Sequence, residues 1–225
     1  KSPNIVFEDC DLEERVKASV DDCFYNSGQS CDAPTRMLVE KSCYDRVVNI
    51  VKKYASQQRV DDASLKGHHI GPLFNKIQFE RVQELIQTGI DEGAKILVGG
   101  LGKPEGKENG WFVKPTVFTH VDNSMHIAQL EIFGPVLVLI SFDTEEEAIM
   151  IANDSPYGLA AYIQTGDELK AQRVASKLKA GQIHINGSNP AYPTPFGGYK
   201  QSGNGREGGL YGLEEFYELK TICRN

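Results

Sequence analysis

The sequence predicts an α/β protein in which a mainly parallel sheet is flanked by helices on both faces. Short apolar runs typical of strands alternate along the chain with longer amphipathic patterns typical of helices, and this alternation indicates right-handed crossovers between parallel strands. The chain has 225 residues, of which 40% are hydrophobic, and this is enough for an ordinary buried core. We therefore expect one domain without internal repeats over residues 1–225.

The strand patterns are short apolar runs bounded by polar or turn-forming residues. The longest apolar run extends from Pro135 to Ile140 and follows Gly134, so a Gly-Pro pair should turn the chain just before it. In chain order, the expected strands are Asn4–Phe7, Thr35–Val39, Lys95–Val98, Val136–Phe142, Leu159–Gln164 and Gln182–Asn186.

The helix patterns place apolar side chains on one face at three- and four-residue spacing. The first of them follows the acidic pair Glu8-Asp9 and carries Val16, Val20 and Phe24. In chain order, the expected helices are Leu12–Tyr25, Cys43–Gln57, Ile77–Glu92, Glu145–Asn153 and Glu168–Lys179.

Two other segments are expected to lack regular structure. Gly99 to Gly110 is rich in glycine and charge and should form a surface loop. Asn186 to Pro195 contains several prolines, which lack the backbone N–H that helices and central strands require, so it should also run over the surface.

Charge and hydropathy argue against nucleic acid and membranes as partners. The net charge of −7 arises from 31 acidic and 24 basic residues that are scattered along the chain, so no basic stripe is available for a phosphate backbone. The longest apolar run falls far short of the roughly 20 residues that a membrane helix needs. No cationic, apolar leader precedes Ser2, and a cytoplasmic location is expected.

Cysteine and histidine spacing gives no sign of disulfides or metal ligands. The five cysteines form no C-x-x-C pair, and their odd number argues against a disulfide framework. No cluster of His, Cys and carboxylates has the spacing of a metal site, and His68-His69 is expected to be a solvated loop pair. We therefore expect reduced thiols and no metal.

Cys31 is the candidate nucleophile because it sits in a small, polar, glycine-containing turn, Asn26-Ser27-Gly28-Gln29-Ser30-Cys31. A structural cysteine usually has apolar neighbours, whereas a reactive thiolate needs hydrogen-bond donors and partial exposure. The turn joins an expected helix to an expected strand, and loops held between rigid elements often carry chemistry. On spacing alone, a structural role for Cys31 stays open.

Longer motifs resemble the aldehyde dehydrogenase superfamily. The segment from Phe24 to Cys31, followed by Ala33-Pro34-Thr35-Arg36, resembles the active-site cysteine motif of that family. Three further segments continue the resemblance in the family's order, and together they cover the whole chain: Glu131-Ile132-Phe133-Gly134-Pro135-Val136, Pro156-Tyr157-Gly158-Leu159 and Pro195-Phe196-Gly197-Gly198-Tyr199-Lys200-Gln201-Ser202-Gly203. The resemblance implies the C-terminal catalytic domain, the half of such an enzyme that contains the cysteine.

The implied reaction is NAD- or NADP-dependent oxidation of an aldehyde to a carboxylic acid through a cysteine hemithioacetal and a thioester. By resemblance, Cys31 is the nucleophile, Glu131 binds the ribose next to nicotinamide, and Phe133 packs against the nicotinamide ring. Gln78 matches a glutamine that reaches the far ribose. From the residues alone, Glu131 would be an exposed acid beside a core Phe133, and Gln78 an exposed residue at the start of a helix.

The implied aldehyde tunnel involves four residues. Phe196 matches an aromatic substrate contact, Tyr192 lies in the variable part of the same loop, and Ser30 and Asp32 flank the nucleophile. The Asp32 charge should raise the pKa of a nearby thiol and could favour cationic or polar aldehydes, although a side chain turned to solvent stays open. Asn26 is expected to shape the turn rather than to stabilise an oxyanion.

Gly203-Asn204-Gly205-Arg206-Glu207-Gly208 matches the G-x-G-x-x-G dinucleotide fingerprint letter for letter. Such a fingerprint must follow a buried strand and precede a helix, with an acid about 20 residues later. The preceding Tyr199-Lys200-Gln201-Ser202 is polar and the chain is nearly finished, so we expect no cofactor fingerprint there.

In relatives, the lysine that matches Lys1 follows Glu-Leu-Gly-Gly, whose glutamate is the general base for thioester hydrolysis. We therefore expect the base, the N-terminal dinucleotide-binding domain and most of the NAD or NADP site to lie outside residues 1–225. The chain alone should not oxidise aldehydes. A non-oxidising alternative, either a thiol esterase or an oligomerisation module, remains open, and a homo-oligomer is expected because a separated domain exposes apolar surface.

Overall fold

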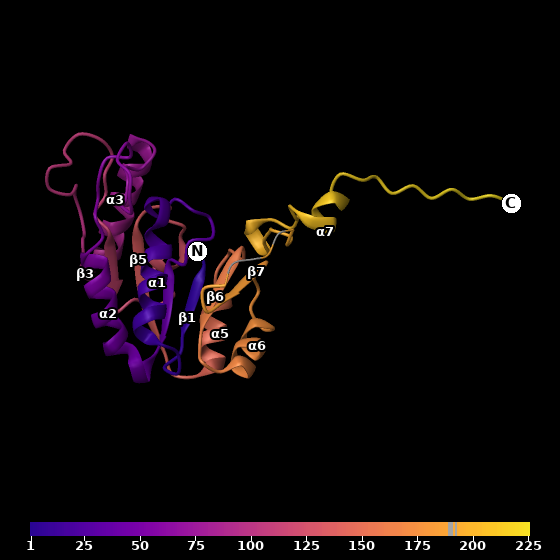
Figure 1. The fold of residues 1–225 in the computed structure, drawn as a ribbon, viewed down its shortest axis with the longest axis horizontal. Helices are drawn as coiled ribbons and strands as arrows, with labels where there is room; N and C mark the ends of the chain where they lie inside the picture. The colour runs from indigo at the N-terminus through magenta and orange to yellow at the C-terminus, as the bar shows by residue number, and fades with distance from the viewer. Residues whose placement is uncertain (189–190, 192) are drawn as a thin grey trace.

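The computed structural model describes residues 1–188, 191 and 193–225. Its centre is a seven-stranded sheet with the strand order β3-β4-β5-β2-β1-β6-β7 (Figure 1). The strand pairs are parallel except for the antiparallel pair β3–β4 at one edge. The strands are β1 Pro3–Val6, β2 Arg36–Glu40, β3 Lys95–Val98, β4 Thr116–Thr119, β5 Val136–Phe142, β6 Ala160–Gln164 and β7 Gln182–Ile185. The expected α/β fold with a mainly parallel sheet is confirmed.

Helices cover both faces of the sheet (Figure 1). Helices α1 and α2 share one apolar cluster with the sheet, and α3 to α6 share the other. The helices are α1 Leu12–Phe24, α2 Tyr44–Ser56, α3 Lys76–Asp91, α4 His126–Gln129, α5 Glu145–Asn153, α6 Glu168–Ala175 and α7 Gly209–Glu214.

Strand β5 shows how the sequence produces this layering. Val136, Val138 and Ile140 belong to the cluster that contains α3 and α5, whereas Leu137 and Leu139 belong to the cluster that contains α1 and α2. Successive side chains of a strand point to opposite faces, so a continuous apolar run buries both of them. The sheet is therefore the shared centre of two hydrophobic cores.

Side-chain caps fix where α1, α3, α5 and α6 begin. Asp11 accepts the backbone N–H of Glu14 at the start of α1, and Asn75 accepts that of Gln78 at the start of α3. Thr144 and Asp167 cap α5 and α6 in the same way. A cap of this kind stabilises a helix by about 1 kcal/mol because it satisfies a backbone donor that has no partner within the helix.

A buried guanidinium ties the N-terminal end of β2 to α5. Arg36 is 0% exposed, and burial lowers its pKa to about 10, so it remains charged at neutral pH. It donates to the Lys1 carbonyl at 3.1 Å, to Asn123 Oδ1 at 2.6 Å and to the Ile151 and Ala152 carbonyls at 3.0 and 2.9 Å. These bonds satisfy carbonyls in the last turn of α5, where a positive charge is favoured by the helix dipole.

The structure corrects several expected elements. Strand β4 was not expected, because Thr-Val-Phe-Thr is a short pattern with polar ends, yet all four residues are buried between β3 and β5. Helix α6 ends at Ala175 instead of Lys179, and Leu178 turns into the core. The short helices α4 and α7 were also not expected.

Several surface features are also clear. Gly99 to Gly110 contains no helix or strand, as expected. After α7 the chain runs away from the body, as Figure 1 shows in yellow, with Phe216 and Leu219 86% and 99% exposed. Within the described part of the chain, no helix has the length and apolar character needed to cross a membrane.

Replacing Leu139 with alanine tests the two-faced core. Leu139 is 0% exposed in the strand that both cores share, so Leu139→Ala should lower the free energy of unfolding by about 2 to 5 kcal/mol. Leu169→Ala is the matched control, because that side chain is 72% exposed and should cost less than about 0.5 kcal/mol. Urea denaturation measures both, and equal losses would contradict the assignment.

Candidate active site

Cys31 follows a strained turn between α1 and β2. Asn26, Ser27 and Gly28 have φ angles of 48°, 61° and 69° in succession, a region that side chains other than glycine rarely adopt. The turn is held by its own polar groups: Ser27 Oγ donates to the Gly71 carbonyl at 3.0 Å, and Asn26 Nδ2 donates to the Gln29 carbonyl at 3.0 Å. The Asn26 contact fits the loop-shaping role expected for this residue.

The turn packs directly against a second turn, Glu131 to Pro135. A Cβ atom on Gly28 would lie 2.1 Å from the Gly134 carbonyl oxygen, and a Cβ on Gly134 would lie 2.7 Å from Val82 Cγ2 in α3. Both positions therefore need glycine, Gly28 for its φ angle and for space, Gly134 for space. Backbone contact between the two turns brings segments that are far apart in sequence to one place.

Cys31, Glu131 and Phe133 line one small cavity of about 10 Å³ at this contact. Phe133 has a φ angle of 56°, which is a rare and costly conformation for an aromatic residue. From the residues alone we expected Phe133 in the core and Glu131 exposed, and both expectations are wrong. Both side chains are half-buried, and it is Ile132, between them, that is 1% exposed.

Gln78 supports the turn that carries Phe133. Its side chain is buried, and Nε2 donates to the Ile132 and Phe133 carbonyls at 2.8 and 2.9 Å. The expectation of an exposed glutamine at the start of a helix is therefore wrong. Whether Gln78 also contacts a cofactor ribose stays a prediction, and the structure already gives its amide nitrogen two acceptors.

A larger cavity of about 330 Å³ lies beside the loop that carries Cys31 and includes Ser30, Asp32 and Phe196 in its lining. Ser30 Oγ donates to Asp32 Oδ1 at 2.5 Å. Asp32 is half-buried, so its side chain is not turned away into solvent. Three of the four predicted substrate residues thus share one cavity, and the fourth, Tyr192, lies outside the described residues.

The same cavity contains residues that the sequence did not single out. Asp22 and Tyr25 lie three positions apart near the end of α1, a spacing that places side chains on one helix face and could have indicated a shared role. Tyr162 and His184 are register partners on β6 and β7, and only the fold brings them together. Tyr162 Oη donates to the Asp32 carbonyl at 2.9 Å, which fixes the loop after Cys31.

The environment of Cys31 raises its pKa. Burial is the main cause, the Asp32 charge adds to it, and hydrogen bonds from the backbone N–H groups of Cys31 and Asp32 act in the opposite direction. All five cysteines are free, and the exposed ones are Cys31 and Cys223. By contrast, Cys23 is 0% exposed, and burial raises its pKa to about 12. Cys31 is therefore an accessible thiol that lines a cavity. Because its pKa is raised, the thiol is protonated at neutral pH.

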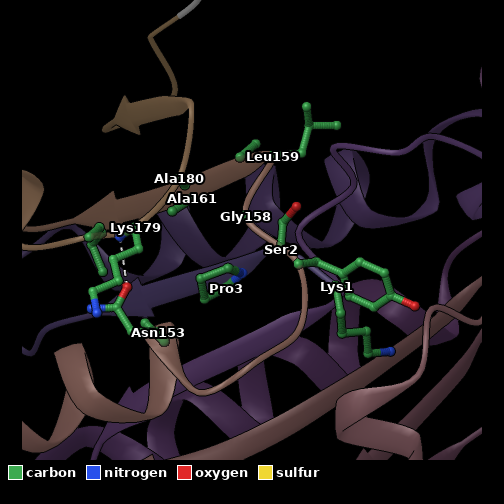
Figure 2. A pocket seen from close by; sticks show the side chains of 13 residues that line it. Lys1, Ser2, Pro3, Asn153, Gly158, Leu159, Ala161, Lys179 and Ala180 are labelled. Atoms are coloured by element: carbon green, nitrogen blue, oxygen red, sulfur yellow. Dashed lines mark hydrogen bonds between the residues drawn. The ribbon is translucent and has the colours of Figure 1, made fainter. Parts of the chain in front are cut away.

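Lys1 borders the Cys31 cavity and a second one of similar size. Burial lowers the pKa of its side chain to about 7, and among the described residues Nζ has no hydrogen-bond partner. Figure 2 shows that Lys1 extends away from Asn153 and Lys179, which are joined by a 2.7 Å hydrogen bond on the other side of the second cavity. None of the predicted site residues is in that cavity's described lining, so it is not the active-site candidate.

The glycine-rich segment Gly203 to Gly208 does not have the surroundings of a dinucleotide-binding site. The glycines from Gly203 to Gly208 follow a 3₁₀ turn at Lys200–Ser202 and precede the six-residue α7, so the strand that a dinucleotide fingerprint requires is missing. Among residues 1–188, 191 and 193–225, no group of three His, Cys or carboxylate side chains is arranged to hold a metal ion.

Gln78→Leu tests the support of the Phe133 turn. The variant leaves two carbonyls without their donor, so the free energy of unfolding should fall by about 1 to 3 kcal/mol. Gln87→Leu, on the exposed face of the same helix, is the matched control and should change it by less than about 0.5 kcal/mol. Urea denaturation measures both. A loss for Gln78→Leu no larger than that of the control would contradict the supporting role.

The pKa of Cys31 can be read from the pH dependence of alkylation. Because the pKa is raised, the iodoacetamide rate at Cys31 should still be rising with pH above the usual pKa of a thiol. Asp32→Asn removes a negative charge that disfavours the thiolate, so it should move the midpoint to lower pH and increase the rate at neutral pH. Asp45→Asn, on the exposed face of α2, should move neither. Mass spectrometry of the Cys31 peptide provides the rates, and an unchanged midpoint in Asp32→Asn would contradict the assignment.

The chain is similar to known proteins over nearly its whole length. Residues 1–222 match the model of the aldehyde dehydrogenase family. A 3-succinoylsemialdehyde-pyridine dehydrogenase from a Pseudomonas species is 48% identical over 222 residues, which is 99% of this chain and 46% of that protein. An aldehyde dehydrogenase C variant from Pseudomonas syringae, crystallised with NAD+ and octanal, is 48% identical with a TM-score of 0.95, over 99% of this chain and 46% of that one.

A Mycobacterium tuberculosis aldehyde dehydrogenase in complex with NAD+ is also similar, with 46% identity and a TM-score of 0.93 over 96% of this chain and 44% of that one. The chain thus spans about half the length of the relatives that it matches. Since the family model covers residues 1–222 and the fold agrees with solved members at close to half sequence identity, this chain belongs to the aldehyde dehydrogenase family.

Proposed function

We propose that residues 1–225 are the catalytic-domain portion of an NAD- or NADP-dependent aldehyde dehydrogenase that oxidises an aldehyde to a carboxylic acid. The proposal depends on one observation. Cys31 lines a single cavity with Glu131 and Phe133, which lie about 100 residues later in the sequence. The strained backbone on both sides supports it, because costly conformations persist where the surrounding structure holds them for a purpose. The proposal that this chain is the cysteine-containing half of the enzyme rests on the same three residues, Cys31, Glu131 and Phe133.

Cys31 acts as the nucleophile. Its sulfur forms a bond to the aldehyde carbon and the carbonyl electron pair moves to oxygen, which gives a hemithioacetal. Backbone N–H groups beside the cysteine are the oxyanion donors that this chain can offer. Because the pKa of Cys31 is raised, a base must remove the thiol proton before attack. After oxidation to the thioester, water replaces the sulfur and releases the acid and the free thiol.

Glu131 and Phe133 form this chain's part of the cofactor site. A carboxylate can accept hydrogen bonds from ribose hydroxyls, and an aromatic ring can pack on a nicotinamide, so the two side chains beside Cys31 fit such a group. NAD or NADP, when bound, would accept the hydride. Gln78 contributes by holding the Ile132 and Phe133 carbonyls, and a direct contact to the far ribose is part of the proposal.

Ser30, Asp32 and Phe196 form the aldehyde pocket, with Tyr192 as a proposed fourth member. The first three are supported by their shared cavity, which borders the nucleophile loop and has the size of a small-molecule site. An aromatic side chain and two polar groups can orient an aldehyde, while the adjacent cysteine attacks it.

A dinucleotide-binding domain outside residues 1–225 would supply the general base and most of the cofactor site. Relatives of about twice this length support that arrangement. A homo-oligomer is also part of the proposal. Its support is the exposed apolar surface on and after α7, where Leu210, Phe216 and Leu219 are 67%, 86% and 99% exposed.

The chain alone should be acylated without oxidising aldehydes. At about pH 9, 4-nitrophenyl acetate should release about one equivalent of nitrophenolate per chain by acylating Cys31, because the thiolate needs no cofactor for this step. Because Cys223 is the other exposed thiol, the experiment is done on Cys223→Ser, where the release should persist, and adding Cys31→Ser should abolish it. Mixing the same chain with NAD+ and an aldehyde should give no NADH.

Two results would contradict the proposal. Acylation that survives when Cys31→Ser is added to Cys223→Ser would remove Cys31 as the nucleophile. Steady NADH formation by the chain alone, followed by absorbance, would show that residues 1–225 already contain the whole cofactor site. Repeated turnover of the ester without NADH would instead favour the thiol esterase.

A further inference from the structure

The larger cavity beside Cys31 has an aromatic and acidic lining. Tyr162 and His184 face each other across β6 and β7, with ring centroids 4.7 Å apart and an interplanar angle of 14°. Asp22 and Tyr25 enter from the end of α1, and Asp32 enters from the loop after the nucleophile. Aromatic faces attract cations, since the ring carries negative potential above its plane.

The charged side chains in the described lining have one sign. Asp22 and Asp32 are both acidic, and no lysine or arginine is among the described residues that line the cavity. Arg15, near Gly187, is engaged elsewhere, because it donates to the Asn186 carbonyl and pairs with Glu14. Burial and the negative charges of Asp21 and Asp32 raise the pKa of Asp22, and His184 acts against them. The cavity therefore has a negative potential that no lysine or arginine in its described lining balances.

His184 supplies an independent sign of a missing ligand. The residue is 9% exposed, and its Nδ1 lies 2.9 Å from the Ser188 carbonyl oxygen, which can only accept, so Nδ1 carries a proton. In the neutral ring, Nε2 is then an acceptor, and it has no partner among the described residues. A buried acceptor without a donor costs free energy that a bound N–H group would recover.

We propose that this cavity selects aldehydes that carry a cationic nitrogen, such as an ammonium group, away from the reacting carbonyl. The inference rests on the proposed function, because it takes Cys31 as the nucleophile that the aldehyde reaches. Asp22 and Asp32 attract the positive charge, the faces of Tyr25, Tyr162 and Phe196 pack around it, and the Nε2 acceptor of His184 is available to an N–H group. An aldehyde with a distal carboxylate is disfavoured by the same charges.

Charged thiol reagents test this on the chain itself. Three methanethiosulfonates of similar size, with a trimethylammonium, a methyl or a sulfonate end, each form a mixed disulfide with Cys31 and release methanesulfinate. At about pH 8, with each rate divided by the rate of the same reagent with a small free thiol, the cationic reagent should modify Cys31 about tenfold faster than the anionic one, as expected for two nearby carboxylates. Mass spectrometry of the Cys31 and Cys223 peptides gives each rate separately.

Asp22→Asn and Asp21→Asn form a matched pair. Asp22 lines the cavity, whereas its neighbour Asp21 faces Lys17 and Gln58. Asp22→Asn should reduce the cationic preference at Cys31 about threefold, and Asp21→Asn should leave it within measurement error. Without any substitution, raising sodium chloride from about 20 mM to about 500 mM should bring the rates at Cys31 together, because salt screens the charges.

The outcomes separate this inference from the function on which it rests. Equal rates for the cationic and anionic reagents, with normal labelling of Cys31 by the neutral one, would overturn the substrate class and leave the nucleophile in place. Equal effects of Asp21→Asn and Asp22→Asn would also overturn it, since the cavity would then not be the source of the preference. Failure of the neutral reagent to label Cys31, while Cys223 is labelled, would overturn the proposed function and the inference together.

Discussion

The active-site candidate depends on one close contact, the approach of the Gly28 backbone to the Gly134 carbonyl. A Cβ at position 28 would lie 2.1 Å from that oxygen, so any side chain there would push the two turns apart. Gly134 is in turn pressed against Val82 of α3, which is fully buried in the core. The separation of Cys31 from Phe133 is therefore set by packing that extends into the hydrophobic core. Because the core is close-packed, both turns are held rigidly.

Strain in the two turns is matched by local hydrogen bonds. Asn26, Ser27 and Phe133 all have positive φ angles, each of which costs about 1 to 2 kcal/mol for a residue with a side chain. Ser27 is anchored to the Gly71 carbonyl, and the Phe133 carbonyl is anchored by Gln78. After Cys31, the chain is held again at Arg36, the first residue of β2. Arg36 donates to two carbonyls at the end of α5. The segment that carries Cys31 is thus held at both ends by hydrogen bonds.

The sequence was sufficient for most of the fold, because the strands bury both faces and so appear as continuous apolar runs. It failed at β4, whose burial comes from the strands on either side and not from its own Thr-Val-Phe-Thr pattern. It also misplaced Phe133 and Gln78. Apolar and polar character normally decide burial, but here Phe133 has a left-handed backbone and is only half-buried, and Gln78 is buried where it donates to two carbonyls of that turn.

The structure brings together segments that the motifs assigned to one site, since Cys31 and Glu131 line one cavity and Ser30, Asp32 and Phe196 line another. The motifs could not indicate Tyr162 and His184, because no spacing relates these residues. Their contact follows from the parallel register of β6 and β7, which pairs them directly. A single sequence contains the pattern of each strand but not the register between two strands, so this part of the site required the fold.

Helix α1 contributes to two features that differ in how much sequence variation they allow, the turn before Cys31 and the lining of the larger cavity. Its C-terminal end leads into the nucleophile turn, whose backbone allows almost no variation, while Asp22 stands on its surface and faces the neighbouring cavity. A side chain on a helix surface can change without moving the helix axis. In the proposed enzyme, a substitution at position 22 would change the lining of the cavity and leave the turn before Cys31 in place, so substrate selectivity and thiol reactivity would be separately adjustable.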